Sequence, residues 1–373
     1  MQVSSVMEIK QKNRNRIYRL ILERGRISKQ EIAYALGLSL PTVTQNLVRL
    51  QEEGLIGEDG TFDSTGGRRA RCLTCLSRAR VAFGIDITQN HVTIAAADLK
   101  GEIVDYERVS VRRRRQEEYI GIIREGISGL MEKNHLDSGQ VLGAGVALPA
   151  IIGEEGRTIQ YMTLLDLPKD FYERLGEAIP FPYRLCNDAN GAGFGEMWKR
   201  KTSSTMLYLF LGATVGGAIL NNGRLYEGVH QRAGEFGHMT LVPGGRPCYC
   251  GKRGCVDSYL ASGVLTDYTD GRIEEFFRLL DAGDAECIRR WEAYKENLAI
   301  VINNLQCFYD CRIVLGGHVG GCIEPYLDDI RSLAAQRNTH SSQCDYVEAS
   351  ILKWEAPAMG AALLYIDEFV KKI

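Results

Sequence analysis

The stretch that decides the fold is "VAFGIDITQNHVTIAAADLKGEIVDYERVSV", residues 81–111. Its apolar residues form three runs separated by turn-forming residues, which is typical of consecutive strands. We expect these strands, then a helix and a further strand, at Val81–Ile87, His91–Asp98, Ile103–Val111, Glu117–Lys133 and Val141–Leu148. This order is the opening of a ribonuclease-H-like or actin-like lobe, in which a turn between the first two strands binds phosphate.

A second stretch repeats that opening from Thr205. It reads "STMLYLFLGATVGGAILNNGRLYEG", with a strand, a glycine-rich turn, a strand and another turn. A duplicated lobe implies a cleft between two halves, where ligands usually bind. The expected fold class is α/β, with an N-terminal winged helix-turn-helix followed by a two-lobed actin-like or ribonuclease-H-like ATPase-type body. The expected boundaries are 1–78 for the winged helix-turn-helix, 79–188 with the C-terminal helix 357–373 for the first lobe, and 189–356 for the second.

The N-terminal segment "RISKQEIAYALGLSLPTVTQNLVRL", residues 26–50, carries the helix-turn-helix pattern. Ser28 and Glu31 form a capping box that opens a short helix. Gly37 supplies a tight turn, and Pro41 is tolerated in the first turn of the next helix. Leu55–Ile56 and Arg71–Leu73 are then expected to form the two strands of a wing. This arrangement predicts a double-stranded DNA partner.

Polar side chains on the third helix are the expected DNA contacts. They are Thr42, Gln45, Asn46 and Arg49. Gln and Asn can pair with adenine, and Arg can pair with guanine or phosphate. Arg68 and Arg69 on a glycine-rich tip are expected to enter a minor groove. The alternatives are a three-helix protein-interaction domain and a merely charged linker.

Charge is unevenly distributed along the 373 residues. Residues 1–80 hold 14 Lys and Arg against 8 Asp and Glu, a net charge of +6, whereas the remainder holds 31 against 39, a net charge of −8. This asymmetry indicates that the N-terminal part meets a polyanion. Neither a signal peptide nor a membrane span is expected, so the protein is predicted to be cytoplasmic and to have no membrane partner.

Eleven cysteines favour a reducing compartment with free thiols over a disulfide framework. Cys72 and Cys75 form a C-x-x-C pair without a second pair nearby, so we expect strand residues there, with metal or redox use as the alternative. The stretch "GHMTLVPGGRPCYCGKRGC", residues 237–255, packs one histidine and three cysteines together, as in metal sites. Arg112–Arg115 is expected to be a solvated edge, with phosphate contacts as the alternative.

Four motifs together resemble the ROK family of repressors and sugar kinases. They are "LCNDAN" (185–190), "AGEFGHM" (233–239), "CYCGKRGCVD" (248–257) and "IVLGGHV" (313–319). The resemblance covers nearly the whole chain, and the winged helix places it with the repressor branch. Four residues can then close a tetrahedral, structural Zn²⁺ site: His238, Cys248, Cys250 and Cys255. The alternative is free thiols without metal.

The resemblance also implies a sugar site. Its expected residues are Asn187, Asp188, Glu235, His238 and Asp257. His238 is expected to face the sugar with the ring edge that does not bind metal. In kinases of the family, the residue at Asp188 accepts the proton of the attacking hydroxyl. The alternative for the segment around Asp188 is a capped turn before a helix at Ala189–Trp198.

The phosphate turns depart from the kinase pattern, which has Asp-x-Gly-Gly-Thr in the first turn. Here residues 86–90 read Asp-Ile-Thr-Gln-Asn, and Thr214 replaces a glycine of the second turn, at 212–217. Side chains then intrude where backbone N–H groups must approach phosphate. ATP is therefore not an expected cofactor, and the catalytic role of Asp188 is expected to be vestigial or weak.

The expected function is a sugar-responsive repressor of carbohydrate-utilisation genes. A sugar or sugar phosphate is expected to bind in the interlobe cleft, and the protein is expected to bind its operator as a homodimer or dimer of dimers. One alternative is an ATP-dependent sugar kinase with an appended DNA-binding domain. Another is a scaffold that binds a partner protein and leaves the cleft empty.

Overall fold

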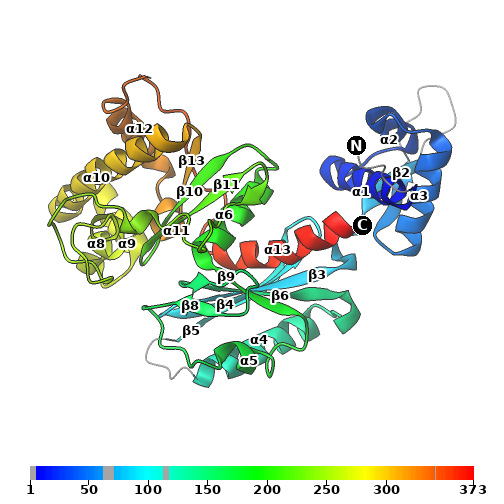
Figure 1. The fold of residues 1–373 in the computed structure, drawn as a ribbon, viewed down its shortest axis with the longest axis horizontal. Helices are drawn as coiled ribbons and strands as arrows, with labels where there is room; N and C mark the ends of the chain where they lie inside the picture. Colours follow the sequence, from blue (N-terminus) through cyan, green and yellow to red (C-terminus); the bar gives the residue numbers. More distant parts are fainter. Residues whose placement is uncertain (1–5, 62–70, 112–116, 341) are drawn as a thin grey trace.

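The computed structural model describes residues 6–61, 71–111, 117–340 and 342–373. An N-terminal head stands beside a larger two-lobed body (Figure 1). The head has three helices and a two-stranded antiparallel sheet: α1 (Val6–Arg24), α2 (Lys29–Leu36), α3 (Leu40–Glu52), β1 (Ile56–Thr61) and β2 (Arg71–Cys75). The predicted winged helix-turn-helix is confirmed, and the second wing strand runs two residues further than expected.

Local sequence signals explain the helix boundaries in the head. The Ser28 hydroxyl accepts a hydrogen bond from the N–H of Glu31, whose carboxylate accepts one from the N–H of Ser28 in return. Gly37 ends α2 in the left-handed conformation, with φ of 64°. Ser39 then caps α3, and Pro41 lies in its first turn. The turn between α2 and α3 is therefore encoded by capping residues at both sides.

The first lobe contains a five-stranded sheet with the order β5-β4-β3-β6-β9. Its strands are β3 (Val81–Ile87), β4 (His91–Asp98), β5 (Ile103–Ser110), β6 (Val141–Leu148) and β9 (Tyr183–Asn187). The first three strands are antiparallel, and β6 and β9 pair in parallel with their neighbours. Two helices and a short hairpin complete the lobe: α4 (Glu117–Lys133), α5 (Phe171–Leu175), β7 (Ile151–Ile152) and β8 (Ile159–Tyr161).

The second lobe repeats this topology in the order β12-β11-β10-β13-β14. Its strands are β10 (Met206–Leu211), β11 (Val215–Asn221), β12 (Arg224–Leu225), β13 (Arg312–Gly316) and β14 (Val347–Ala349). Again three strands are antiparallel and two are added in parallel. Its helices are α7 (Asp257–Leu260), α8 (Gly263–Thr266), α9 (Ile273–Asp281), α10 (Ala285–Tyr309), α11 (Gly317–Gly320) and α12 (Leu327–Ala335). The predicted two-lobed fold is confirmed.

Two helices join the sheets. α6 (Asp188–Lys199) packs on the second sheet, and α13 (Ala356–Lys372) packs on the first sheet and on α6 (Figure 1). The helices approach so closely that a Cβ at Gly360 would lie 1.7 Å from the carbonyl oxygen of Gly191. Backbone contact of this kind leaves little room for the helices to slide past each other.

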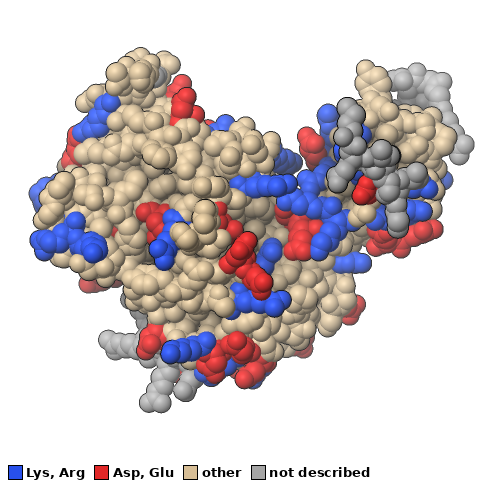
Figure 2. All heavy atoms as spheres, in the orientation of Figure 1, with Lys and Arg blue, Asp and Glu red and all other residues tan. Residues whose placement is uncertain are grey.

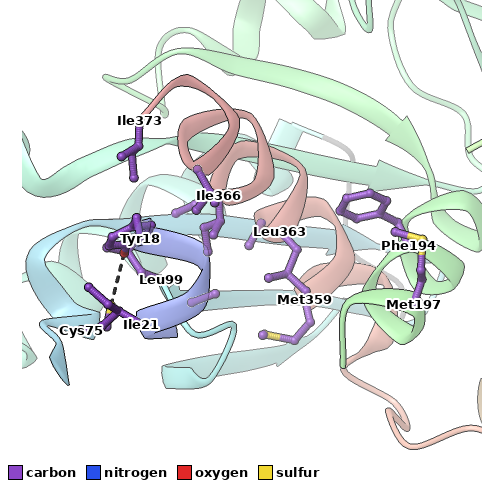
Figure 3. Close-up of a cluster of buried hydrophobic side chains, with 14 of the residues drawn as sticks. Tyr18, Ile21, Cys75, Leu99, Phe194, Met197, Met359, Leu363, Ile366 and Ile373 are labelled. Atoms are coloured by element: carbon purple, nitrogen blue, oxygen red, sulfur yellow. Dashed lines mark hydrogen bonds between the residues drawn. The ribbon is translucent and has the colours of Figure 1, made fainter. Parts of the chain in front are cut away.

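The far end of α13 meets the head. One buried cluster includes Tyr18 and Ile21 of α1, Leu99 of the first lobe, and Ile366 and Ile373 at the end of α13 (Figure 3). Tyr18 and Cys75 form a buried hydrogen bond of 3.2 Å, which fixes α1 against the wing. Within the described residues, no helix is long and apolar enough to cross a membrane.

Candidate functional site

A cavity lies between the two lobes. The first lobe contributes Asp86 at the end of β3 and Arg108 of β5, whereas the second contributes Thr214 and His318. Asp188, the first residue of α6, also lines it. The cavity therefore opens at the helix that joins the lobes, so a ligand there would touch both halves of the body.

Two carboxyl groups face this cavity. Asp86 is 7% exposed, and its Oδ1 has no hydrogen-bond partner within the described part of the chain. Burial, together with the nearby charge of Asp188, raises the pKa of Asp86 to about 8. Burial also raises the pKa of Asp188 to about 7, against the opposing effect of the Ala189 N–H, which donates to its Oδ1 at 2.8 Å. A carboxyl with this pKa can accept a proton from a hydroxyl near neutral pH.

The first phosphate turn binds its own N–H groups. The hydroxyl of Thr88 accepts hydrogen bonds from the N–H of Asn90 at 3.3 Å and of His91 at 3.0 Å. The side chain of Gln89 donates to the carbonyl of Leu164 at 2.7 Å, which ties the turn to a neighbouring loop. Two N–H groups of this turn, those of Asn90 and His91, are therefore already bound within it and are not free for a phosphate.

The second phosphate turn is tied down in a similar way. The N–H of Gly212 donates to the carbonyl of Thr214 at 3.1 Å. The N–H of Val215 donates to Oδ2 of Asp257 at 2.7 Å, and Asp257 is 5% exposed. Asp257, which the sequence assigned to the sugar, thus binds backbone with one of its two oxygens.

The other sugar candidates have different surroundings. Oδ1 of Asn187 accepts from the N–H of Asn190, and its Nδ2 donates to the carbonyl of Ala150 at 3.1 Å. Asn187 therefore caps α6, as the alternative interpretation of this segment expected, and α6 begins at Asp188 instead of Ala189. Glu235 remains more accessible, since its side chain is 39% exposed, and its charge raises the pKa of Asp188 further.

Four potential metal ligands converge in the second lobe. The ligand atoms of His238, Cys248, Cys250 and Cys255 all lie within 4.8 Å of one another. Nδ1 of His238 is buried without a hydrogen-bond partner among the described residues, as expected of an atom that donates its lone pair to a metal. The cluster could hold a metal ion, and three thiolates with one imidazole form a set typical of closed structural sites.

The loop that carries the cysteines is built by backbone hydrogen bonds. The N–H of Cys248 donates to the carbonyl of Lys252, and Thr240 pairs with Cys255 in an isolated bridge. Gly254 has φ of 84°, and a Cβ there would lie 1.8 Å from the carbonyl oxygen of Val242. Only glycine fits this tight approach, which explains its place directly before a ligand.

His238 links the metal cluster to the sugar candidates. Its Nε2 lies 3.8 Å from the carboxylate of Glu235 and 3.2 Å from the hydroxyl of Tyr249. Nε2 thus faces Glu235 and Tyr249, while Nδ1 is buried without a partner among the described residues. This leaves Nδ1 as the ring atom that could bind a metal ion held by the cluster.

The head presents a polar face on α3. Gln45 and Arg49 are exposed, whereas Thr42 is half-buried because its hydroxyl pairs with Ser39 at the helix start. Asn46 was expected on this face, but it is only 6% exposed and its amide donates to the carbonyl of Thr42 at 2.8 Å. In Figure 2, blue and red side chains both appear on the visible face of the head, as they do over the body.

Two arginine predictions lie outside the described residues. They concern Arg68 and Arg69 at the wing tip and the run Arg112–Arg115. The C-x-x-C pair is described: Cys72 and Cys75 are buried strand residues, as expected. Sequence reasoning missed the cationic residues Arg108, Lys353 and His318 in the cleft, although His318 lies in one of the quoted motifs.

Comparison with known proteins agrees with this geometry. The family model described as "ROK family" matches residues 82–368, more than three quarters of the chain. The chain belongs to the ROK family. A model for winged helix-turn-helix DNA-binding domains matches residues 10–56, so this ROK protein carries an N-terminal winged helix-turn-helix.

Individual ROK relatives include both regulators and kinases. A xylose repressor of Bacillus spizizenii is 25% identical over 384 residues, with 99% of each chain covered. A glucokinase of Halalkalibacterium halodurans is 29% identical over 278 residues, which are 66% of this chain and 83% of the glucokinase. A solved ROK family transcriptional regulator, a homologue of an Escherichia coli protein named MLC, superposes with a TM-score of 0.75 at 19% identity, covering 98% of this chain and 97% of its own. The full-length matches are repressors or regulators, whereas the glucokinase matches only part of this chain.

Proposed function

We propose that this ROK protein is a transcriptional repressor whose affinity for its operator is set by a sugar or sugar phosphate in the interlobe cleft. The observation that carries the proposal is the combination of a DNA-binding head with phosphate turns that bind their own N–H groups. The Bacillus spizizenii relative that matches over its full length is a xylose repressor, which supports the proposal. A kinase would instead need free backbone donors around the transferred phosphate.

The proposed sugar site lies where the cleft meets the metal cluster. Glu235 and Asp188 bracket neighbouring hydroxyls, and Nε2 of His238 contacts a third polar group of the sugar. Asn187 and Asp257 support the site without direct sugar contact in this proposal. Asn187 donates to the carbonyl of Ala150, and Asp257 accepts from the N–H of Val215, so each fixes the backbone that lines the site. Asp188 in this proposal accepts a sugar hydroxyl without transferring phosphate.

We assign the metal as structural Zn²⁺. A closed set of three cysteines and one histidine leaves no coordination position for substrate. When bound, the ion draws His238 to the cysteine loop and so fixes the edge of the ring that faces Glu235. Burial raises the pKa of Cys255 to about 12, so metal binding would have to displace a proton from that thiol.

We propose that α6 and α13 transmit the effect of ligand binding from the cleft to the head. α6 begins at Asp188, inside the cleft, and touches α13 backbone to backbone at Gly191 and Gly360. A ligand that closes the lobes would move the second sheet, and α6 with it. Because the backbone contact with α6 leaves α13 little room to slide, we propose that α13 follows this movement and carries it to its far end.

Side chains of α1 form hydrogen bonds with the C-terminal end of α13. From α1, Gln11 donates to the carbonyl of Lys372 at 2.8 Å, Arg14 donates to that of Ile373 at 3.2 Å, and Asn15 donates to that of Val370. These carbonyls belong to the last turn of α13, where no further helical N–H groups serve them. The contact therefore couples the orientation of the head to α13.

On DNA, α3 is the proposed recognition helix. Gln45 and Arg49 would reach base edges, Thr42 and the partly covered Asn46 would support them, and Arg68 and Arg69 of the wing would enter a minor groove. We propose that two copies bind a pseudo-palindrome, so that a change in head orientation alters the half-site spacing. We propose three domains, at 1–78, at 79–188 with 357–373, and at 189–356.

Fluorescence anisotropy with a DNA duplex selected by the protein from a random library tests this function. Expected results are tight binding by the full chain, weaker binding by Arg49→Ala, and a change of at least about fivefold on adding one sugar or sugar phosphate. The variant Asn15→Ala should keep DNA binding and sugar binding but reduce the ligand response. DNA affinity that no sugar or sugar phosphate changes would contradict the proposal.

A further inference from the structure

A groove lies between α1 and α3 on the side of the head that carries the exposed polar residues of α3. Its lining residues come from both helices: Ile9, Lys10 and Asn13 from α1, and Thr42, Gln45, Asn46 and Arg49 from α3. The DNA contacts expected from the sequence include these four α3 residues but none from α1. The α1 residues therefore share a surface with the proposed recognition helix, and the proposed function gives them no role.

The sequence of α1 explains where this groove begins. Ile17 and Ile21 are fully buried and belong to one apolar cluster with Val43 and Leu47 of α3. Asn13 precedes Ile17 by four residues, so it lies on the same face of α1, one turn closer to the start of the helix. An apolar residue at this position would extend the core, whereas burying an amide without partners is costly. The core between the two helices therefore ends at Ile17, and a polar groove takes its place.

The groove has the charge and the donors that an anion needs. Lys10 and Arg49 are exposed cations, one from each helix, and neither forms an ion pair with another described residue. Asn13 and Gln45 add side-chain amides, and no described carboxylate is among the lining residues. Such a lining favours a polyanion over a cationic or apolar ligand.

The dimensions of DNA decide which part of it can reach α1. The major groove is about 12 Å wide, and a helix with its side chains is about 10–12 Å across, so α3 alone would fill it. A second helix packed beside α3 then meets the sugar–phosphate backbone that borders the groove, not the base edges. A lysine ammonium binds phosphate as a compact charge, and an asparagine amide can donate to a phosphate oxygen.

We propose that Lys10 and Asn13 bind a backbone phosphate of the operator while α3 occupies the adjacent major groove. The proposal rests on the proposed function, because it needs α3 to be the recognition helix. It makes α1 a second DNA-contacting helix, which orients α3 on the duplex without reading its sequence. The contact adds affinity that depends on salt and not on the base pairs.

The opposite face of α1 is the one that binds α13. Gln11 and Asn15 donate to carbonyls at the end of α13. They lie two residues before and two residues after Asn13, so each is turned by ~160° from it about the helix axis. In this proposal α1 contacts DNA with one face and α13 with the other, so the ligand response and the phosphate contact share a single helix.

A methylphosphonate scan with the full-length protein tests the contact. In the duplex that the protein selects, one phosphate at a time is replaced by a neutral methylphosphonate, and affinity is measured by fluorescence anisotropy under the conditions of the selection. At one position beside the α3 site, the neutral group should weaken binding by wild type about three- to tenfold and leave binding by Lys10→Gln almost unchanged. Lys10→Gln should also bind selected and scrambled duplexes more weakly by a similar factor, and its log K should depend on log salt with a slope smaller by about 1.

Three further variants sharpen the result. Lys12→Gln is the matched control, because Lys12 is an exposed cation of the same helix that does not line the groove, and it should behave as wild type. Lys10→Arg keeps the charge and should keep the salt slope. Asn13→Ala should weaken binding about threefold without changing the slope, since an amide carries no charge. Equal responses of wild type and Lys10→Gln at every methylphosphonate, or the same loss in Lys12→Gln, would overturn the contact.

The contact and the proposed function fail in different ways. The scan needs no change of ligand, so a DNA affinity that no sugar or sugar phosphate alters would contradict the ligand response and leave the α1 contact standing. A scan in which Lys10→Gln follows wild type throughout would remove the α1 contact and leave the repressor function standing.

Discussion

The cluster of His238, Cys248, Cys250 and Cys255 and the two phosphate turns differ in what they leave free. In the cluster, four ligand atoms converge and Nδ1 of His238 has no partner among the described residues. In the turns, the N–H groups of Asn90, His91 and Val215 are bound by Thr88 and Asp257. The cluster therefore retains an unpaired ligand atom that could bind a metal ion, whereas the turns have used N–H donors in hydrogen bonds of their own.

Under the proposed function, this difference separates binding of a sugar from transfer of phosphate to it. Sugar recognition depends on a few side chains held at fixed positions, and a metal bound by the cluster would hold His238 beside Glu235. Phosphoryl transfer depends on free backbone donors around the transferred group, so we expect it to be weakened where side chains occupy those donors. The predictions that follow test each side of this contrast.

The largest effect is expected when the metal cluster is broken. Cys255→Ser should remove the bound zinc, because it deletes one of four ligands, and should cost about 4 kcal/mol where free zinc is ~1,000 times its Kd. Elemental analysis and thermal melting with and without a chelator measure both effects. Cys307→Ser, at an exposed position on α10, should change neither. Unchanged metal content in Cys255→Ser would refute the assignment of this cluster.

The next effect concerns the sugar wall. Glu235→Gln should weaken binding of the effector by about 10–100-fold, because it removes charge-assisted hydrogen bonds worth roughly 1.5–3 kcal/mol. The melting temperature should stay the same, since the side chain is 39% exposed. Calorimetry with the sugar that shifts DNA binding measures this change, and Glu292→Gln on α10 is a control. Equal affinity in Glu235→Gln and wild type would remove Glu235 from the site.

A smaller effect is expected from pH. The pKa of Asp86 is about 8 in the folded protein and 3.8 as a free side chain, so the folded state keeps a proton that the unfolded state releases. Its contribution to stability is present below pH ~4 and is lost as the pH rises through about 8. Asp86→Asn should therefore gain roughly 3–4 kcal/mol in the free energy of unfolding relative to wild type between pH 5 and pH 8, since each pH unit between the two pKa values is worth about 1.36 kcal/mol.

Urea unfolding at pH 5, 6.5 and 8 measures that difference. Asp345→Asn, at an exposed site in the second lobe, is the matched control and should follow wild type. A constant difference between Asp86→Asn and wild type across this range would mean that Asp86 is ionised throughout.

The smallest effect is expected for phosphoryl transfer. With Mg-ATP and a pool of hexoses, pentoses and amino sugars, wild type should release no more ADP than Asp188→Asn. The physical reason is that N–H groups of both turns, those of Asn90, His91 and Val215, already donate to Thr88 and Asp257 and are not available to phosphate. Sugar-dependent ADP release that disappears in Asp188→Asn would show that the turns rearrange and that the protein is also a kinase.

Several features could be predicted from the sequence because their causes are local. The strands Val81–Ile87 and His91–Asp98 and the helix Glu117–Lys133 have the predicted bounds. The capping box of Ser28 and Glu31 also forms as expected. Apolar periodicity and capping depend on only a few neighbouring residues, so each strand or helix can be predicted from its own segment.

Other predictions needed contacts between distant segments. The polar pattern of α3 placed Asn46 on the exposed face, but its amide turns back to the carbonyl of Thr42. Asp257 was assigned to the sugar alone, although a turn 42 residues earlier donates to it. The same limit explains why Arg108 and Lys353 were missed: each is an ordinary surface cation until the fold brings both to one cavity.

The sequence by itself determined the winged head, the duplicated lobes, the ROK motifs and the four clustered ligands, because periodicity, capping residues and spacing encode them locally. Only the tertiary structure decided which N–H groups the phosphate turns had already bound, which carboxyls were buried together, and how α13 reaches from α6 to α1. The burial of a side chain, the charges near it and the contacts between helices all depend on segments far apart in the chain. They are therefore set only when the chain has folded and these segments have come together.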